Sequence, residues 1–200
     1  GEIVFCEPTH ESREGTLSQL VERSGATVVH PYNDERIIAG QGTAAWELLT
    51  AHPDLDAIVA PVSGGGLLSG TLLAAQGKNP KIRVYGAEPL EADDTIRSLE
   101  AGRIVPNLSV DTIADGLRAQ IGPLTFPIIQ QHVTKVLPIT EDEIIAAMRL
   151  LWERLKIIVE PSGAVPLAAV LKRPEIFCNQ KTGLILSGGN TDLDSLPWSR

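Results

Sequence analysis

The chain has 200 residues, of which 43% are hydrophobic and 21% charged, with a formal net charge of −8 at pH 7. This size fits one sizeable globular domain, or one domain with part of another. The acidic balance argues against nucleic acid or an anionic membrane surface as the main partner, and no apolar run reaches the ~20 residues of a membrane span. Because the sequence has only Cys6 and Cys178 and no secretory leader, we expect a cytoplasmic protein.

Short β-branched runs alternate along the chain with longer helical patterns. Strands are predicted at residues 2–6, 26–30, 56–60, 82–87, 134–138 and 182–186, and helices near 14–23, 41–51, 67–76, 123–132, 141–156 and 163–171. Most strand runs are continuously apolar, as in strands that are buried on both faces. This alternation predicts an α/β fold, with an open, mainly parallel sheet and helices on both faces.

The helix predicted at 141–156 has the clearest local signals. Thr140 and Glu143 form the sequence pattern of a capping box at its start. Its buried face is predicted from the helical spacing of Ile144, Met148, Leu151 and Leu155.

The first 31 residues are predicted to form a separate piece. One strand, one helix and one strand are too few to bury a core of their own. We therefore expect residues 1–31 to be the last piece of a small domain whose other part lies upstream. Residues 32–200 are expected to form the large domain.

Three successive glycines follow the strand predicted at 56–60, within Pro61–Gly70 (PVSGGGLLSG). Glycine N–H groups have no Cβ beside them, and a helix N-terminus adds positive potential, so this loop could bind a phosphate. The loop is neither GxGxxG nor a Walker loop, which disfavours a dinucleotide or a nucleoside triphosphate. A plain tight turn, which one glycine would satisfy, is the alternative.

A second glycine segment, Ser187-Gly-Gly-Asn190, follows the strand predicted at 182–186. Ligands of open α/β sheets bind beyond the carboxyl ends of the strands, so both glycine segments are expected to face one crevice. The Ser187 hydroxyl could hydrogen-bond a heteroaromatic nitrogen there. The alternative is a turn in which Asn190 caps the following residues.

Two further segments contain carboxylates at expected turns. Glu88 and Asp94, with a backbone carbonyl between them, are oxygen donors of the kind that Mg²⁺, Ca²⁺ or Mn²⁺ prefers. Composition alone favours a solvated acidic turn at a helix start. Glu160 stands at a break between two helices, where it could be a cap or approach a ligand. No serine lies in a GxSxG elbow, which disfavours a serine hydrolase.

Seven segments in register resemble the pyridoxal-phosphate (PLP) enzymes of the serine racemase and serine/threonine dehydratase family. They are CEPTHESRE (6–14), AGQGT (39–43), PVSGGGLLSG (61–70), YGAEPLEADD (85–94), TIADGL (112–117), IIVEPSGA (157–164) and LSGGN (186–190). The resemblance implies a fold type II large domain with a remnant of the small domain. It also implies deamination of L-serine or L-threonine to the 2-oxo acid and ammonia, with or without racemisation.

The same resemblance implies roles for individual residues. The cofactor phosphate would be held by the backbone N–H groups of Ser63, Gly64, Gly65, Gly66 and Leu67. The ring would be lined by Gly116, Glu160 and Gly188, with Ser187 at its nitrogen. Mg²⁺ or a similar ion (Ca²⁺ or Mn²⁺) would be held by Glu88, Asp94 and the carbonyl of Ala92. Some relatives bind ATP as an effector, at positions that match Lys156 and Asn190, and relatives are usually homodimers.

One feature of the family is missing from this chain. Its six lysines (78, 81, 135, 156, 172 and 181) all lie outside the Ser-x-Lys-x-Arg-Gly-type motif that carries the family's Schiff-base lysine. The resemblance therefore implies the carboxyl-terminal part of such an enzyme, inactive by itself.

Three other interpretations stay open. One is a non-catalytic, truncated PLP-fold binding module that keeps the phosphate cradle. Another is a fold type II sulfhydrylase or synthase, against which the acidic cation motif argues. A nicotinamide-dependent dehydrogenase is disfavoured by the missing GxGxxG.

Overall fold

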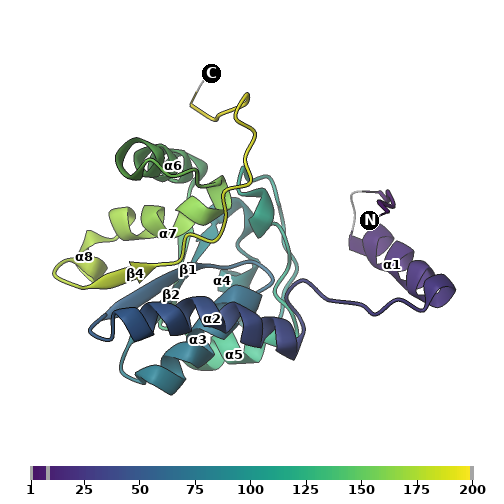
Figure 1. The fold of residues 1–200 in the computed structure, drawn as a ribbon, viewed down its shortest axis with the longest axis horizontal. Helices are drawn as coiled ribbons and strands as arrows, with labels where there is room; N and C mark the ends of the chain where they lie inside the picture. The colour runs from purple at the N-terminus through teal and green to yellow at the C-terminus, as the bar shows by residue number, and fades with distance from the viewer. Residues whose placement is uncertain (1, 8–9, 199–200) are drawn as a thin grey trace. The chain divides into compact units, whose positions relative to one another are not determined.

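The structure, a computed structural model, describes residues 2–7 and 10–198 (Figure 1). The chain divides into two compact units, Gly1–His30 and Pro31–Arg200. The division falls beside the boundary expected from the sequence. The assignment of the first unit to a small domain stays a prediction.

Among its described residues, the first unit contains one helix, α1 (His10–Ser24), which is followed by Gly25. Gly25 has a φ of 67°, in the left-handed region that favours glycine after a helix, and its N–H donates to the Val21 carbonyl (2.8 Å). The strands predicted at 2–6 and 26–30 are wrong for the described residues, because neither segment pairs with another strand there. Ile3 and Phe5 consequently stay 79% and 90% exposed.

The second unit is built on a four-stranded parallel sheet in the order β3-β2-β1-β4 (Figure 1). The strands are β1 (Ala57–Pro61), β2 (Arg83–Pro89), β3 (Lys135–Ile139) and β4 (Thr182–Leu184). The register pairs Val59 of β1 with Tyr85 of β2 and with Leu184 of β4. The predicted α/β fold with a parallel sheet is therefore confirmed.

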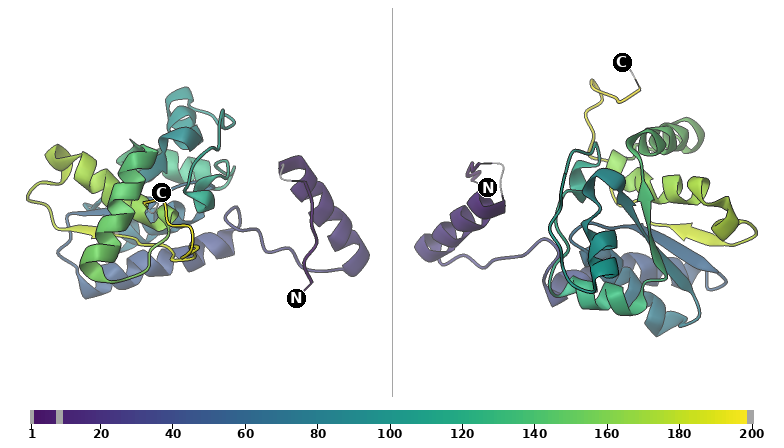
Figure 2. Two further views of the ribbon diagram at one scale, coloured as in Figure 1. Left: turned by 90° about the horizontal axis from the view of Figure 1, so that it is seen from above. Right: turned by 180° about the vertical axis from the view of Figure 1, so that it is seen from behind.

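Helices cover both faces of this sheet (Figures 1 and 2). One face carries α2 (Glu35–Ala51), α3 (Gly66–Lys78) and α5 (Thr125–His132). The other carries α6 (Glu141–Leu155), α7 (Pro161–Lys172) and α8 (Pro174–Phe177). Short connections complete the unit: η1 (Leu90–Ala92), α4 (Asp94–Ala101) and η2 (Asp115–Leu117). Alternate β1 side chains enter opposite cores, Ile58 and Ala60 on one side and Ala57 and Val59 on the other.

Helix α6 confirms the capping box and most of the predicted face. The side chain of Thr140 and that of Glu143 each bond the other residue's backbone N–H. Three of the predicted face residues are buried, whereas Leu155 is 57% exposed. Leu155 ends the helix, and the left-handed Lys156 (φ 59°) then turns the chain away, so the helical periodicity stops short of it.

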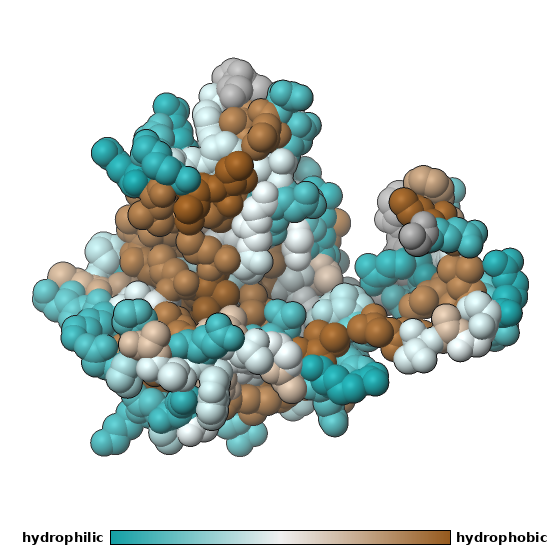
Figure 3. Space-filling model, in the orientation of Figure 1, coloured by the Kyte–Doolittle hydropathy of each residue, from teal (hydrophilic) through white to brown (hydrophobic). Residues whose placement is uncertain are grey.

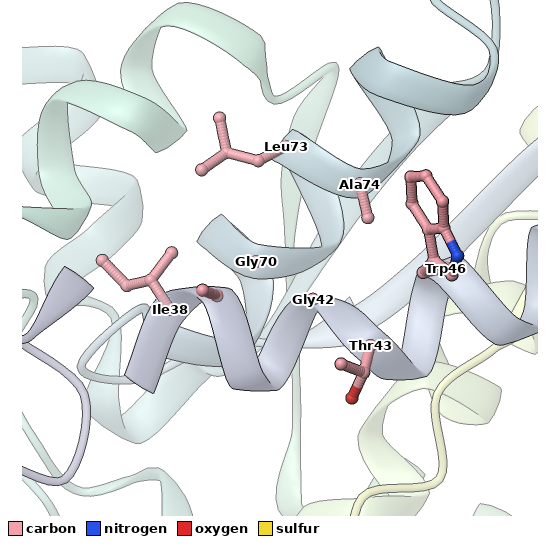
Figure 4. Close-up of a pocket in the computed structure, with 8 residues that line it drawn as sticks. Ile38, Gly42, Thr43, Trp46, Gly70, Leu73 and Ala74 are labelled. Atoms are coloured by element: carbon pink, nitrogen blue, oxygen red, sulfur yellow. The ribbon is translucent and has the colours of Figure 1, made fainter. Parts of the chain in front are cut away.

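Helices α2 and α3 approach each other most closely at two glycines. A Cβ on Gly70 would lie 2.4 Å from the Ile38 carbonyl oxygen and 2.5 Å from the Gly42 nitrogen. Beside this contact is a shallow apolar groove of about 310 Å³ (Figure 4), lined by Ile38, Ala39, Gly42, Thr43, Trp46, Gly70, Leu73 and Ala74. The Lys78 ammonium lies 3.9 Å from the centre of the Trp46 ring, a cation–π contact.

The surface of the second unit has an apolar region, and each unit exposes one cysteine. Figure 3 shows apolar residues gathered on the face that carries α7 and β4. Within residues 2–7 and 10–198, no helix is both long and apolar enough to cross a bilayer. Both cysteines are free, exposed thiols, with Cys6 in the first unit and Cys178 in the second.

The close approach of α2 and α3 predicts opposite effects for two glycines of one helix. Gly70→Ala forces a methyl group against backbone atoms and should lower the free energy of unfolding by about 1–3 kcal/mol. Gly77→Ala is the matched control, because nothing lies within 4 Å of its Cβ position, and it should raise that free energy by about 0.5–1 kcal/mol. Urea unfolding measures both. Equal stability of the two variants would contradict this account of the interface.

Candidate functional site

The glycine loop between β1 and α3 is conformationally restricted at all three glycines. Gly65 is the N-cap of α3 with a φ of 91°, and a Cβ there would lie 2.7 Å from atoms of Ile121 and Thr125. Cβ atoms on Gly64 and Gly66 would meet Tyr32 at 2.4 and 3.0 Å. A plain turn that needs one glycine is therefore excluded.

The loop also presents unused hydrogen-bond donors. None of the backbone N–H groups from Ser63 to Leu67 donates to another residue in the described part of the chain. Other polar atoms of the loop are occupied: the Ser63 hydroxyl pairs with both the N–H and the carbonyl of Ala119, each at 2.8 Å. The Gly64 carbonyl accepts from Gly122 N–H (3.2 Å) and the Thr125 hydroxyl (2.6 Å). A row of free N–H groups at a helix N-terminus is an anion cradle, so these residues fit a phosphate.

The second glycine segment follows β4 and is held by Glu160, the N-cap of α7. Glu160 N–H donates to the Gly188 carbonyl (3.1 Å), and its carboxylate accepts from Asn190 N–H (2.8 Å). A Cβ on Gly188 would lie 2.7 Å from that carboxylate. The Ser187 side chain next to it is exposed, and its hydroxyl bonds no other residue that the structure describes. It is therefore open to a ligand.

Gly116 joins this group through Ser162. Gly116 N–H donates to the Ser162 hydroxyl (3.0 Å), and a Cβ on Gly116 would lie 3.8 Å from Glu160 Oε1. The structure thus brings together Gly116 and Glu160, which the family resemblance places at the cofactor ring, and Gly188, which it places among the cofactor-binding residues. Ser162 is only 2% exposed, and the sequence did not single out its contact with Gly116. Its place in the first turn of α7, two residues after Glu160, was the available signal.

Tyr32 is another site residue that the sequence did not indicate. It belongs to the second unit and packs against Gly64 and Gly66, as the short Cβ distances show. The signal was an aromatic residue just before α2, in the turn whose Asp34 caps that helix by accepting from Arg36 N–H (2.8 Å). An aromatic side chain beside an anion cradle limits the access of water to it.

The two predicted carboxylate ligands are buried, Glu88 near the end of β2 and Asp94 at the start of α4, so a solvated turn is wrong for them, although Glu91 between them is exposed. Glu88 and Asp94 are 0% and 1% exposed. The two Glu88 oxygens accept from the N–H groups of Thr95 (3.0 Å) and Ile96 (3.1 Å) at the start of α4. Asp94 Oδ2 accepts from Ile121 N–H (2.7 Å), whereas its Oδ1 is buried with no partner within the described residues.

Burial makes ionisation of these two carboxyl groups costly. Desolvation, with a smaller contribution from the nearby Asp94 carboxylate, raises the pKa of Glu88 to about 8, against the lowering effect of the hydrogen bonds from Thr95 and Ile96. Desolvation also raises the pKa of Asp94, to about 6, against the lowering effect of the Ile121 N–H. A divalent cation offsets this cost, because it supplies positive charge where burial removes water.

Two carboxylates and a backbone carbonyl suit a hard divalent cation, which binds both charged and neutral oxygen ligands. No three His, Cys, Asp or Glu side chains cluster anywhere in residues 2–7 and 10–198, so two carboxylates are the charged ligands available. The buried Ala92 lies in η1, between Glu88 and Asp94 along the chain, and its backbone carbonyl is the third oxygen of the predicted set. Oxygen donors of these types fit Mg²⁺ or Ca²⁺.

The structure gives no support to the expected effector role of Lys156 and Asn190. The Lys156 ammonium donates to the Glu153 carbonyl (2.6 Å), and Asn190 N–H is bound to Glu160. Neither contact indicates a nucleotide.

Comparisons with known proteins agree along the whole chain. The family model described as "Pyridoxal-phosphate dependent enzyme" matches residues 1–188. The β-hydroxyaspartate dehydratase of Paracoccus denitrificans is 47% identical over 199 residues, covering 100% of this chain and 63% of the relative. The serine racemase of Dictyostelium discoideum is 50% identical over 198 residues, covering 97% of this chain and 61% of the relative. The chain thus spans under two thirds of the length of these relatives.

Solved structures are similar as well. Maize serine racemase superimposes with a TM-score of 0.93 at 44% identity, over 97% of this chain and 60% of that one. The T.th. threonine deaminase gives 0.91 at 43% identity, over 96% of this chain and 64% of that one. Both share the parallel α/β arrangement described above.

Proposed function

Because this chain belongs to the family of pyridoxal-phosphate dependent enzymes, we propose that the whole protein is a dehydratase or racemase of a small β-hydroxy amino acid. L-serine and L-threonine are the proposed substrates, since relatives that are 43–50% identical are serine racemases and a structurally similar enzyme is a threonine deaminase. The observation that carries the proposal is the row of free N–H groups from Ser63 to Leu67. Both this row and the Gly116–Glu160–Gly188 group belong to the second unit.

Each part of the site has a proposed task. The free N–H groups hold the cofactor phosphate, and Gly116, Glu160 and Gly188 line the ring. When bound, PLP stabilises negative charge at the α-carbon of the amino acid. The Ser187 hydroxyl hydrogen-bonds the ring nitrogen without favouring its protonation, unlike a carboxylate, and this limits the charge drawn into the ring. Such a partner suits prompt loss of a β-hydroxyl group.

The positions of the lysines decide whether the 200-residue chain can catalyse the reaction by itself. None of the six lies in the family's Schiff-base motif, so we propose that the 200-residue chain binds PLP reversibly and does not turn over amino acids. The five residues that we propose hold the phosphate, Ser63 to Leu67, do lie in this chain.

This predicts a non-covalent complex that depends on the phosphate. PLP should bind the chain at least about tenfold more tightly than pyridoxal, since only PLP uses the N–H cradle. Borohydride treatment followed by mass spectrometry should show no stoichiometric adduct on a single lysine. Equal affinity for pyridoxal would contradict the cradle, and a single stoichiometric adduct would contradict the proposed lack of a Schiff-base lysine.

Ser187 is the residue whose replacement tests the activity. In the whole enzyme, Ser187→Ala should lower 2-oxo acid formation from L-serine or L-threonine about tenfold, because it removes the proposed hydrogen bond to the ring nitrogen, and tenfold corresponds to about 1.4 kcal/mol. Stability should change by less than about 0.5 kcal/mol, because the side chain is exposed. The control is Ser195→Ala, an exposed serine of the following segment.

Two outcomes would count against the proposal. Near-normal turnover by Ser187→Ala would remove that residue from the site. A wild-type enzyme that converts neither L-serine, L-threonine nor β-hydroxyaspartate would favour the non-catalytic binding module instead.

We further propose that Glu88, Asp94 and the Ala92 carbonyl hold Mg²⁺ in a structural role. The buried, costly carboxylates and the unpartnered Asp94 Oδ1 support this. The homodimer and an ATP effector near Lys156 and Asn190 are proposals that rest on family resemblance alone.

The cation site makes a prediction about thermal stability. Mg²⁺ should raise the melting temperature of the wild type, because it binds the folded state. The double variant Glu88→Gln, Asp94→Asn should lose this rise. The matched double variant Glu100→Gln, Asp111→Asn removes two negative charges elsewhere and should keep it. A wild type that does not respond to Mg²⁺ would show that the proposed site is wrong.

A further inference from the structure

The hydroxyl of Thr125 lies against the glycine loop that follows β1. Thr125 is the first residue of α5, and it is 0% exposed. Its Oγ1 donates to the Gly64 carbonyl (2.6 Å) and accepts from Gly122 N–H (3.0 Å). A Cβ on Gly65 would lie 2.7 Å from the same oxygen. One side chain of α5 therefore contacts two of the three glycines of the loop.

The single hydroxyl proton of Thr125 serves the Gly64 carbonyl. A hydroxyl has one proton to donate and two lone pairs that accept. The other carbonyl within reach of Thr125 Oγ1, that of Gly122, is farther away (3.1 Å) and already accepts from Phe126 N–H (2.9 Å). The shorter bond to Gly64 therefore takes the proton.

A fixed Gly64 carbonyl also fixes the direction of the next N–H group. The peptide unit between Gly64 and Gly65 is trans, and the C=O and N–H bonds of a trans unit point in opposite directions. A carbonyl held by Thr125 therefore turns the Gly65 N–H away from that hydroxyl. This N–H donates to no other residue that the structure describes, and it belongs to the free row from Ser63 to Leu67.

Glycines do not keep such an orientation by themselves. Without Cβ atoms, Gly64 and Gly65 have wide conformational freedom, so the peptide unit between them needs partners to hold it. A reversed unit would point a carbonyl oxygen at the bound phosphate and would repel it. The other donor to the Gly64 carbonyl, Gly122 N–H, is longer (3.2 Å) than the Thr125 bond. The Ser69 hydroxyl of α3 donates to the Thr125 carbonyl (3.4 Å), which ties α5 to the same helix.

We propose that Thr125 is a positioning residue for the cofactor phosphate, because its hydroxyl holds the Gly64 carbonyl so that the Gly65 N–H stays aimed at the phosphate. This rests on the phosphate cradle of the proposed function. Thr125 acts through the peptide unit and not by touching the ligand. Its hydroxyl therefore supports only the part of PLP binding that depends on the phosphate.

Binding of PLP and of pyridoxal to the 200-residue chain, measured by equilibrium dialysis, tests the proposal. Thr125→Val keeps the size of the side chain and removes the hydroxyl, so the PLP affinity should fall about tenfold, which corresponds to about 1.4 kcal/mol. The affinity for pyridoxal, which has no phosphate, should stay within about twofold. Thr125→Ser keeps the hydroxyl and should bind PLP within about twofold of the wild type.

The matched control is Thr71→Val in α3, the helix whose N-terminus forms the cradle. Thr71 is also 0% exposed, and its hydroxyl has no hydrogen-bond partner among the described residues. The same change there should leave both affinities unchanged. A merely structural role for Thr125 would lower the affinities for PLP and pyridoxal by the same factor, and that result would overturn the proposal.

The outcomes separate the role of Thr125 from the cradle itself. A wild type that binds PLP no more tightly than pyridoxal would show that the cradle is wrong, and the role of Thr125 with it. If the wild type prefers PLP and Thr125→Val binds PLP within about twofold of it, the role of Thr125 alone is wrong. Thr125→Ser binding PLP as weakly as Thr125→Val would also overturn that role. Should Thr125→Val fail to fold, Thr125→Ala, which removes the hydroxyl without adding bulk, decides by the same comparison.

Discussion

Parallel pairing of β1 with both β2 and β4 is the constraint on which the candidate sites depend. It places the carboxyl ends of three neighbouring strands along one edge of the sheet, where ligands of open α/β folds bind. The glycine loop leaves β1 there, Glu88 lies near the end of β2, and Ser187 follows β4. Groups more than a hundred residues apart in the sequence thus come from adjacent strands.

One stretch of backbone, residues 112–122, then links these groups to one another. Three of its backbone N–H groups donate to side-chain oxygens: Ile113 to Glu141 (2.8 Å), Gly116 to Ser162 (3.0 Å) and Ile121 to Asp94 (2.7 Å). Its Ala119 pairs with the Ser63 hydroxyl. The glycine loop, the Gly116–Glu160–Gly188 group and the acidic pair therefore share a single scaffold that has little regular structure of its own.

Local signals predicted the parts of the fold that depend on neighbouring residues. Apolar runs located the four strands of the sheet, and Thr140 with Glu143 located the start of α6. The strands predicted at 2–6 and 26–30 failed because a strand requires a partner, which no local pattern supplies. The burial of Glu88 and Asp94 and the contacts of Tyr32 and Ser162 could not be read from composition, since each depends on residues distant in sequence.

The two thiols have a practical consequence. One exposed cysteine lies in each compact unit, and neither is joined in a disulfide. Thiol-specific labels attach to such side chains, so the natural sequence already carries a pair of spectroscopic reporters. Dipolar coupling between spin labels, or energy transfer between fluorophores, on Cys6 and Cys178 would measure the distribution of distances between the two units in solution. They would also show whether cofactor or cation narrows that distribution.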